Sequence, residues 1–155
     1  MAPDRLRFDY THSKPLTKRE IDRIEEIVNS AILRNFPVLT SETTLTQAKE
    51  MGALAFFGEK YGEKVRTVMV TFGSQAAPGE AFSFELCGGI HCHSTGEIGF
   101  FKIISETGIA AGVRRIEALA GKRAYQYTKE VLERRIEEIT EVLKVPVNEI
   151  VGRLK

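Results

Sequence analysis

Glycines and prolines divide most of this chain into short segments, and this punctuation limits the fold to short strands combined with helices. In residues 81–86, the apolar side chains Phe82, Phe84 and Leu86 alternate with smaller or polar ones, a pattern typical of a half-buried strand. Residues 65–72 are rich in β-branched side chains, which favour strands. We expect strands over residues 5–11, 65–72, 81–86, 98–105 and 113–119, the last two joined by a glycine-bearing turn, and an extended segment over 37–44.

Two capping-box spacings and one long apolar stripe predict the helices. Thr17 lies three residues before Glu20 and Thr44 three before Gln47, so helices should begin at both points. The first should end near residue 35, and the second, a short one, near Gly52. A stripe at helical spacing predicts a helix over 122–143, which Pro146 ends, followed by a short helix over 147–154. Together these patterns predict an α+β domain, with a mostly antiparallel sheet packed with helices.

Composition predicts a folded protein and gives little sign of its partner. Of the 155 residues, 43% are hydrophobic and 28% charged, which argues against disorder. The 22 basic and 21 acidic residues leave a formal charge of +1, so a nucleic-acid partner would need a local basic patch. The two cysteines form no disulfide framework, and the start of the chain has no apolar signal core. No apolar run reaches membrane-spanning length, so we expect a cytoplasmic protein with no membrane partner.

The segment from Cys87 to His93 carries the strongest chemical signal. Cys87 and His91 are four residues apart, so they would share one side of the chain if it turned helically after Cys87. Zinc accepts thiolate and imidazole ligands, and Gly88 and Gly89 between them remove side-chain bulk. Two ligands are not a complete site, so further ones would have to come from elsewhere.

Two other interpretations of the Cys87–His91 pair remain open. A cysteine after a strand is often a small buried hydrophobic residue, and a nearby histidine is often only hydrogen-bonded. Cys87 could also be a nucleophile with His91 as its base. No third, orienting residue stands out, so the catalytic residues stay unknown.

Several blocks together resemble the editing domain of alanyl-tRNA synthetases, a fold shared with threonyl-tRNA synthetases. The resemblance covers nearly the whole chain in the family's order. The blocks are Cys87-Gly88-Gly89-Ile90-His91, Thr95-Gly96-Glu97-Ile98-Gly99, Phe101-Lys102-Ile103, Glu106-Thr107-Gly108 and residues 110–118, with 2–12 and 52–62 upstream. On this resemblance we interpret residues 1–144 as the carboxyl-terminal portion of an editing domain and 145–155 as a tail or the start of a linker.

The resemblance implies an activity and a metal. The family attaches alanine to its tRNA, using ATP and magnesium in a separate catalytic domain. Its editing domain hydrolyses tRNA mischarged with serine or glycine. That site holds zinc through a His-x-x-x-His pair and a Cys-x-x-x-His pair, and Cys87 and His91 match the second. Partners would be the tRNA for alanine and the remaining synthetase domains.

The first zinc pair should lie upstream of Asp4, and no His-x-x-x-His spacing occurs among His12, His91 and His93. Ile90 stands where the family usually has threonine, which leaves the two ligands intact. With half of the ligands, we expect this fragment to hold zinc poorly or not at all, and to be nearly inactive in editing.

Other candidates lie near the zinc pair and on a basic stretch. Thr95 and Glu97 could contact substrate, although a role in a turn is the favoured interpretation. Residues 112–135 hold seven basic and three acidic residues, including Arg114, Arg115, Lys122 and Arg123, and so could contact tRNA phosphates. An ordinary solvated helix face is the alternative. At the level of function, the alternatives are a tRNA-docking module without chemistry and a free-standing editing hydrolase, which would need its own histidine pair.

Overall fold

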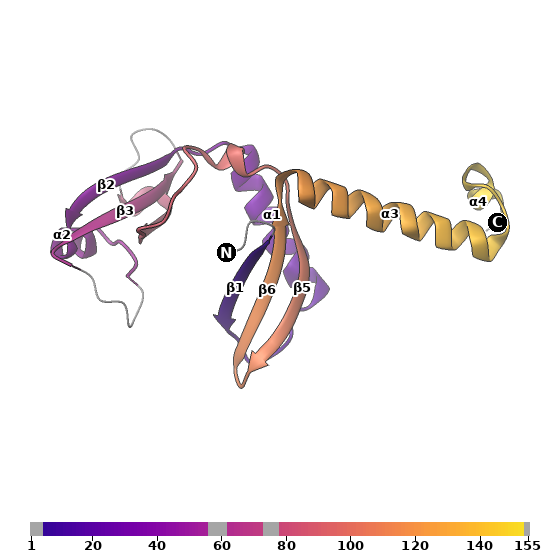
Figure 1. The fold of residues 1–155 in the computed structure, drawn as a ribbon, viewed down its shortest axis with the longest axis horizontal. Helices are drawn as coiled ribbons and strands as arrows, with labels where there is room; N and C mark the ends of the chain where they lie inside the picture. Colours follow the sequence, from indigo (N-terminus) through magenta and orange to yellow (C-terminus); the bar gives the residue numbers. More distant parts are fainter. Residues whose placement is uncertain (1–4, 56–61, 73–77, 154–155) are drawn as a thin grey trace. The chain divides into compact units, whose positions relative to one another are not determined.

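The computed structural model describes residues 5–55, 62–72 and 78–153. It divides the chain into two compact units. Met1–Ile21 and Phe100–Lys155 form one, here called the terminal unit, and Asp22–Gly99 form the other, the central unit. Each unit contains a three-stranded sheet, and the ribbon in Figure 1 can be followed through both units. The expected α+β class with antiparallel strands is therefore confirmed, with the strands divided between two sheets.

The terminal unit is built on a sheet in the order β1-β6-β5. Its strands are β1 (Leu6–Thr11), β5 (Phe101–Ala110) and β6 (Val113–Ala120), all antiparallel to their neighbours. The β5–β6 hairpin turns through Gly112, whose φ of 70° lies in the left-handed region that glycine adopts without strain. The predicted glycine-bearing turn between these strands is confirmed.

Helix α3 (Gly121–Leu143) follows β6 without a loop and ends at Lys144, whose φ is 53°. Only its beginning enters the core, where Ala124 is fully buried, whereas Leu132 is 60% and Val142 81% exposed. The short helix predicted beyond it is present as η3 (Val147–Glu149) and α4 (Ile150–Arg153), and residue 154 lies outside the described residues. No helix in the described part of the chain is long and apolar enough to cross a membrane.

Helix α1 (Lys18–Leu33) begins at the predicted capping box. The Glu20 carboxylate accepts a hydrogen bond from the Thr17 N–H at 2.7 Å, and the Thr17 hydroxyl accepts one from the Glu20 N–H at 3.3 Å. These bonds satisfy two backbone donors that a helix start otherwise leaves free. The other end of α1 buries Ala31 and Ile32 in the central unit.

The central unit is built on a sheet in the order β2-β3-β4. Its elements are β2 (Val38–Thr44), α2 (Leu45–Glu50), β3 (Lys64–Thr71), η1 (Pro78–Glu80) and β4 (Ala81–Leu86). The second predicted capping box, Thr44 with Gln47, starts α2. One core cluster consists of Ala48, Ala53, Val65, Phe84 and Leu86, so β3 and β4 bury one face against α2 and the chain that follows it.

The prediction of a strand over residues 98–105 is wrong at both ends. Residues Thr95–Ile98 form the 3-10 helix η2, and β5 begins only at Phe101. Gly99, with φ of 70°, turns the chain between them. The strand also continues to Ala110 because the long hairpin partner β6 pairs with it as far as Ala110, with two register shifts, a contact that local alternation does not encode.

Candidate functional site

Cys87 follows directly on β4, where the chain leaves the central sheet. Its N–H donates to the Arg66 carbonyl on β3 at 3.1 Å, and its own carbonyl accepts from Arg66 Nε at 3.0 Å. The preceding residue is also fixed, because the Leu86 N–H donates to the Leu54 carbonyl at 2.9 Å. The cysteine backbone is thus positioned by the sheet rather than by the loop that follows.

The side chains of Cys87 and His91 converge on one place beside Gly89. A Cβ atom added at Gly89 would lie 3.5 Å from Cys87 Sγ and 3.7 Å from His91 Nε2. The Gly89 N–H also approaches Cys87 Sγ at 3.4 Å. The expected helical turn is absent, and the chain instead bends at Gly89, between the two side chains. Glycine at this position leaves open the space that faces both ligand atoms.

His91 Nε2 is buried and has no hydrogen-bond partner among the described residues. A buried imidazole nitrogen without a partner is costly, and metal ligation is one way to satisfy it. The donor set, a thiol sulfur and an imidazole nitrogen, suits zinc. Within residues 5–55, 62–72 and 78–153, however, no group of three or more His, Cys, Asp or Glu side chains could hold a metal. The described residues therefore fit one half of a zinc site.

Thr95 and Glu97 close the turn at η2. The Thr95 hydroxyl donates to the Ala31 carbonyl at 2.6 Å and accepts from the Phe36 N–H at 2.8 Å, and the residue is only 6% exposed. The Glu97 carboxylate accepts the His93 N–H at 3.3 Å. In these contacts the Thr95 hydroxyl uses its one donor and one of its two acceptor lone pairs. The expectation that Thr95 or Glu97 contacts substrate stays a prediction.

Arg114 is held inside the terminal unit by Glu106. Arg114 Nη2 donates to Glu106 Oε2 at 2.8 Å, and Arg114 Nε donates to Oε1. The Tyr10 hydroxyl adds a bond to Oε1 at 2.8 Å, and the Leu16 N–H one to Oε2 at 3.4 Å. With the Glu106 side chain only 5% exposed, the Arg114 hydrogen bond above all lowers the pKa of Glu106 to about 2.

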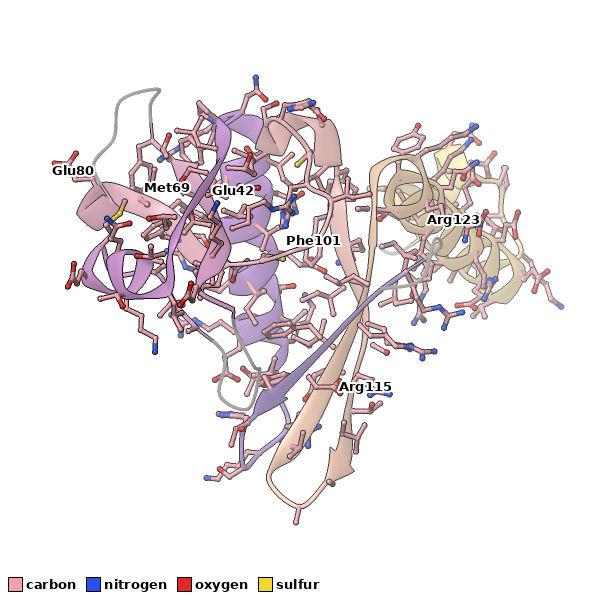
Figure 2. All side chains as sticks on the ribbon, turned by 60° about the vertical axis from the view of Figure 1, so that its left-hand side comes forward. Glu42, Met69, Glu80, Phe101, Arg115 and Arg123 are labelled. Carbon is pink, nitrogen blue, oxygen red and sulfur yellow. The ribbon has the colours of Figure 1, made fainter. Side chains whose placement is uncertain are left out.

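The other basic candidates differ in whether their side chains are already paired with a carboxylate. Arg115 on β6 makes a bidentate pair with Asp9 on β1, with distances of 2.7 and 2.8 Å, and this hydrogen bond is the main cause of a lowered pKa for Asp9. Lys122 and Arg123 lie exposed in the first turn of α3, and neither has a partner in the part of the chain that the structure describes. Figure 2 labels Arg115 on the sheet and Arg123 on the helix. Free cations are thus at the start of α3 rather than on β6.

Arg66 was not singled out from the sequence. It lies in β3 between Val65 and Thr67, which are 8% and 2% exposed. The available signal was a lone arginine within a run of buried, β-branched residues. Its pairing with Cys87 was not visible, because residues 66 and 87 become neighbours only when β3 and β4 pair.

Comparison with known proteins shows what these residues are similar to. Residues 65–117 match the family model described as the threonyl and alanyl tRNA synthetase second additional domain. Within these residues the chain is similar to this second additional domain. Along nearly its whole length it is also similar to alanine–tRNA ligases, so the resemblance noted from the sequence is confirmed.

Three of the similar ligases come from different organisms. The alanine–tRNA ligase of Desulforamulus reducens is 52% identical over 153 residues, which are 99% of this chain and 16% of the ligase. That of Alkaliphilus oremlandii is 50% identical over 154 residues, 99% of this chain and 16% of the ligase. That of Chelativorans sp. is 46% identical over 156 residues, 100% of this chain and 18% of the ligase. The chain thus spans about a sixth of the length of these relatives.

The region matched by the second additional domain contains Cys87, His91 and Arg66. It also contains the Glu106–Arg114 pair, whereas Lys122 and Arg123 on α3 lie beyond residue 117. The proposed ligands and the residue that holds Cys87 therefore belong to the same part of the domain.

Proposed function

We propose that this segment is part of an editing site in an alanine–tRNA ligase, where tRNA carrying serine or glycine in place of alanine is hydrolysed. The observation that carries the proposal is the convergence of Cys87 Sγ and the unpartnered His91 Nε2 beside Gly89. The similarity of the whole chain to alanine–tRNA ligases supports the substrate class.

The physical need for such a site follows from the limits of amino-acid selection. An apolar pocket shaped for alanine cannot strongly reject serine, which adds one hydroxyl group, and it cannot exclude glycine by size. A second, hydrolytic site that recognises the wrong amino acid supplies the missing discrimination. The bond to be broken there is the ester between the amino acid and a ribose hydroxyl of the tRNA.

Cys87 and His91 would hold a zinc ion together with ligands from outside this sequence. Zinc supplies Lewis acidity to the ester carbonyl or to the attacking water. The chain's own contribution is to present a sulfur and a nitrogen ligand on a backbone fixed to β3. With two of the four ligands, this chain alone should bind zinc weakly. Thr95 and Glu97 shape the neighbouring turn, and the catalytic residues stay unassigned.

The tRNA partner would be contacted first by Lys122 and Arg123. Both side chains are exposed at the start of α3, where the helix dipole also favours the negative charge of phosphate. Arg114 and Arg115, occupied by Glu106 and Asp9, would contribute less. In the parent ligase, ATP and magnesium would serve the separate charging reaction, the other ligase domains would be partners, and the location would be cytoplasmic.

The proposal is tested by deacylation of seryl-tRNA specific for alanine. The assay compares this chain with the same chain extended upstream by the stretch that precedes the matching segment in the Desulforamulus reducens relative. We expect the extended chain to release serine and to retain zinc, and this chain to do neither well. In the extended chain, Cys87→Ser should reduce the release of serine at least about 100-fold, because one metal ligand is lost, whereas Cys92→Ser should leave it unchanged.

Two outcomes decide against the proposal. If neither chain releases serine while both bind the tRNA, the segment is a docking module without chemistry. If this chain releases serine without any extension, it behaves as a free-standing hydrolase and the requirement for upstream ligands is wrong.

A further inference from the structure

Arg66 is a charged residue in β3, a strand whose other side chains, apart from the exposed Lys64, are buried or half-buried. It is half-buried in β3, and its two neighbours in sequence are buried. Arginine rarely enters such positions unless its donors are used, because burying an unpaired polar group is costly. The residue therefore needs a structural or functional reason.

The usual reason, an ion pair across the sheet, is not found among the residues that the structure describes. Glu42 on β2 lies directly opposite Arg66 in the register and is labelled in Figure 2. No ion pair joins the two among the described residues, although opposite charges at this spacing often pair. Arg66 Nη2 is instead buried without a hydrogen-bond partner in the described structure.

Arg66 contacts the backbone of Cys87 with both its own backbone and its side chain. The Arg66 carbonyl accepts the Cys87 N–H at 3.1 Å, and Arg66 Nε donates to the Cys87 carbonyl at 3.0 Å. The second bond fixes the peptide that leads from Cys87 into Gly88. A charge-assisted bond to a carbonyl is stronger than a neutral one.

The loop beyond Cys87 has little else to hold it. Gly88 and Gly89 have no side chains, and a Cβ added at Gly88 would meet nothing within 4 Å. Ile90 is 99% exposed, so it contributes no packing. Glycine-rich backbone is free to adopt many conformations. The direction in which Cys87 Sγ and His91 Nε2 point therefore depends on how the chain leaves Cys87.

We propose that Arg66 is a positioning residue for the Cys87–His91 pair. By holding the carbonyl of Cys87, its guanidinium keeps the glycine bend in the conformation that brings Sγ and Nε2 to one metal ion. The inference rests on the proposed function only in assuming that this ion is bound there. That Arg66 holds the loop is a separate statement, and it can be tested without metal.

The test uses the whole chain with Cys92→Ser, so that Cys87 is the sole thiol. Cobalt(II) replaces zinc, because its binding to a thiolate gives an absorption band that can be titrated. The variants are Arg66→Met, Arg66→Lys and the control Lys64→Met, which alters an exposed residue on the same strand. Titrations are made at low temperature, after circular dichroism has shown that each variant is folded.

We expect Arg66→Met to weaken cobalt binding at least about tenfold, and Arg66→Lys to weaken it less. Lysine keeps the charge, but its amine lies one bond beyond the position of Nε. The control should bind as the parent chain does. Equal cobalt affinity in Arg66→Met and the control would overturn the proposal. If Arg66→Met does not fold, Arg66→Lys decides, and unchanged affinity in that variant would overturn it.

Amide hydrogen exchange without metal separates this inference from the proposed function. Loss of the Arg66 contact should speed exchange selectively at Cys87 and Gly89, whose N–H groups are hydrogen-bonded at the start of the loop, whereas a general loss of stability would speed exchange throughout the central unit. Faster exchange at these residues, with no cobalt band in any variant, would show that Arg66 holds the loop while the metal site fails. Unchanged exchange at these residues in Arg66→Met would contradict the positioning role even if cobalt binds.

Discussion

Hydrogen bonds to buried polar atoms decide the roles of single residues in this chain. Three side-chain donors, two from Arg114 and one from Tyr10, and the backbone N–H of Leu16 surround the Glu106 carboxylate. The same principle assigns Thr95, whose hydroxyl is used by Ala31 and Phe36. A buried polar side chain whose hydrogen bonds are made within the chain stabilises the fold.

Replacing Glu106 with glutamine should lower the free energy of unfolding at pH 7 by about 2 kcal/mol, because a charge-assisted pair is lost and Arg114 is left half-buried. The measurement is urea unfolding monitored by circular dichroism. Glu130→Gln is the matched control, since Glu130 is exposed on α3 and has no partner in the described residues. Equal losses in the two variants would contradict the role given to Glu106.

The pH dependence of stability should change in the same variant. The pKa of Glu106 in the folded chain is about 2, below its ordinary value of 4.5. The ionised carboxylate therefore stabilises the fold fully at pH values above about 4.5. This stabilisation is lost as the pH falls from about 4.5 towards 2, where the unfolded chain binds the proton more readily. Glu106→Gln should therefore lose less stability than the parent chain over this range, in urea unfolding at a series of pH values. Identical pH profiles would refute the lowered pKa.

At the scale of elements, the start of a helix depends on residues close in sequence, whereas the limits of a strand depend on pairing with distant residues. Both capping boxes were identified from spacing alone, because a cap is a contact between residues three apart. The limits of β5 were not, because they depend on β6 and on the turn at Gly99. The candidate site follows the same division: the Cys87–His91 spacing is local, whereas the contact between Arg66 and Cys87 joins two strands.

Thr17→Ala should destabilise the chain by about 1 kcal/mol, because α1 loses the side chain that caps it. Thr17→Ser keeps the hydroxyl and should recover most of this stability. Thermal unfolding of the two variants beside the parent chain measures the difference. A serine variant as unstable as the alanine variant would show that the threonine methyl group, rather than the cap, is responsible.

At the scale of the whole molecule, burial is concentrated before the middle of α3. The buried core of the terminal unit includes Phe101, Ile103, Ile116, Ala118 and Ala124, and none of the described residues beyond Ala124 is buried. Val147 and Val151 are 58% and 68% exposed. These burial values agree with the interpretation of residues 145–155 as a tail or linker, which stays a prediction.

Truncation after Lys144 should therefore change the free energy of unfolding by less than about 0.5 kcal/mol, since no core side chain is removed. Urea unfolding of the truncated and full chains checks this. A truncation after Ala120 is the contrasting case, because it removes the buried Ala124 and should destabilise the terminal unit. A large loss after the first truncation would move the domain boundary beyond residue 144.

The sequence by itself determined the α+β class, both helix caps and the Cys87–His91 pair, together with the family that these blocks resemble. These features depend on residues close together along the chain or on motifs in a fixed order. Only the tertiary structure decided that the strands form two sheets, that Arg114 is held by Glu106, and that Arg66 anchors Cys87. Each of these depends on strands that meet only after folding, and no local pattern encodes which side chain will then lie beside which backbone.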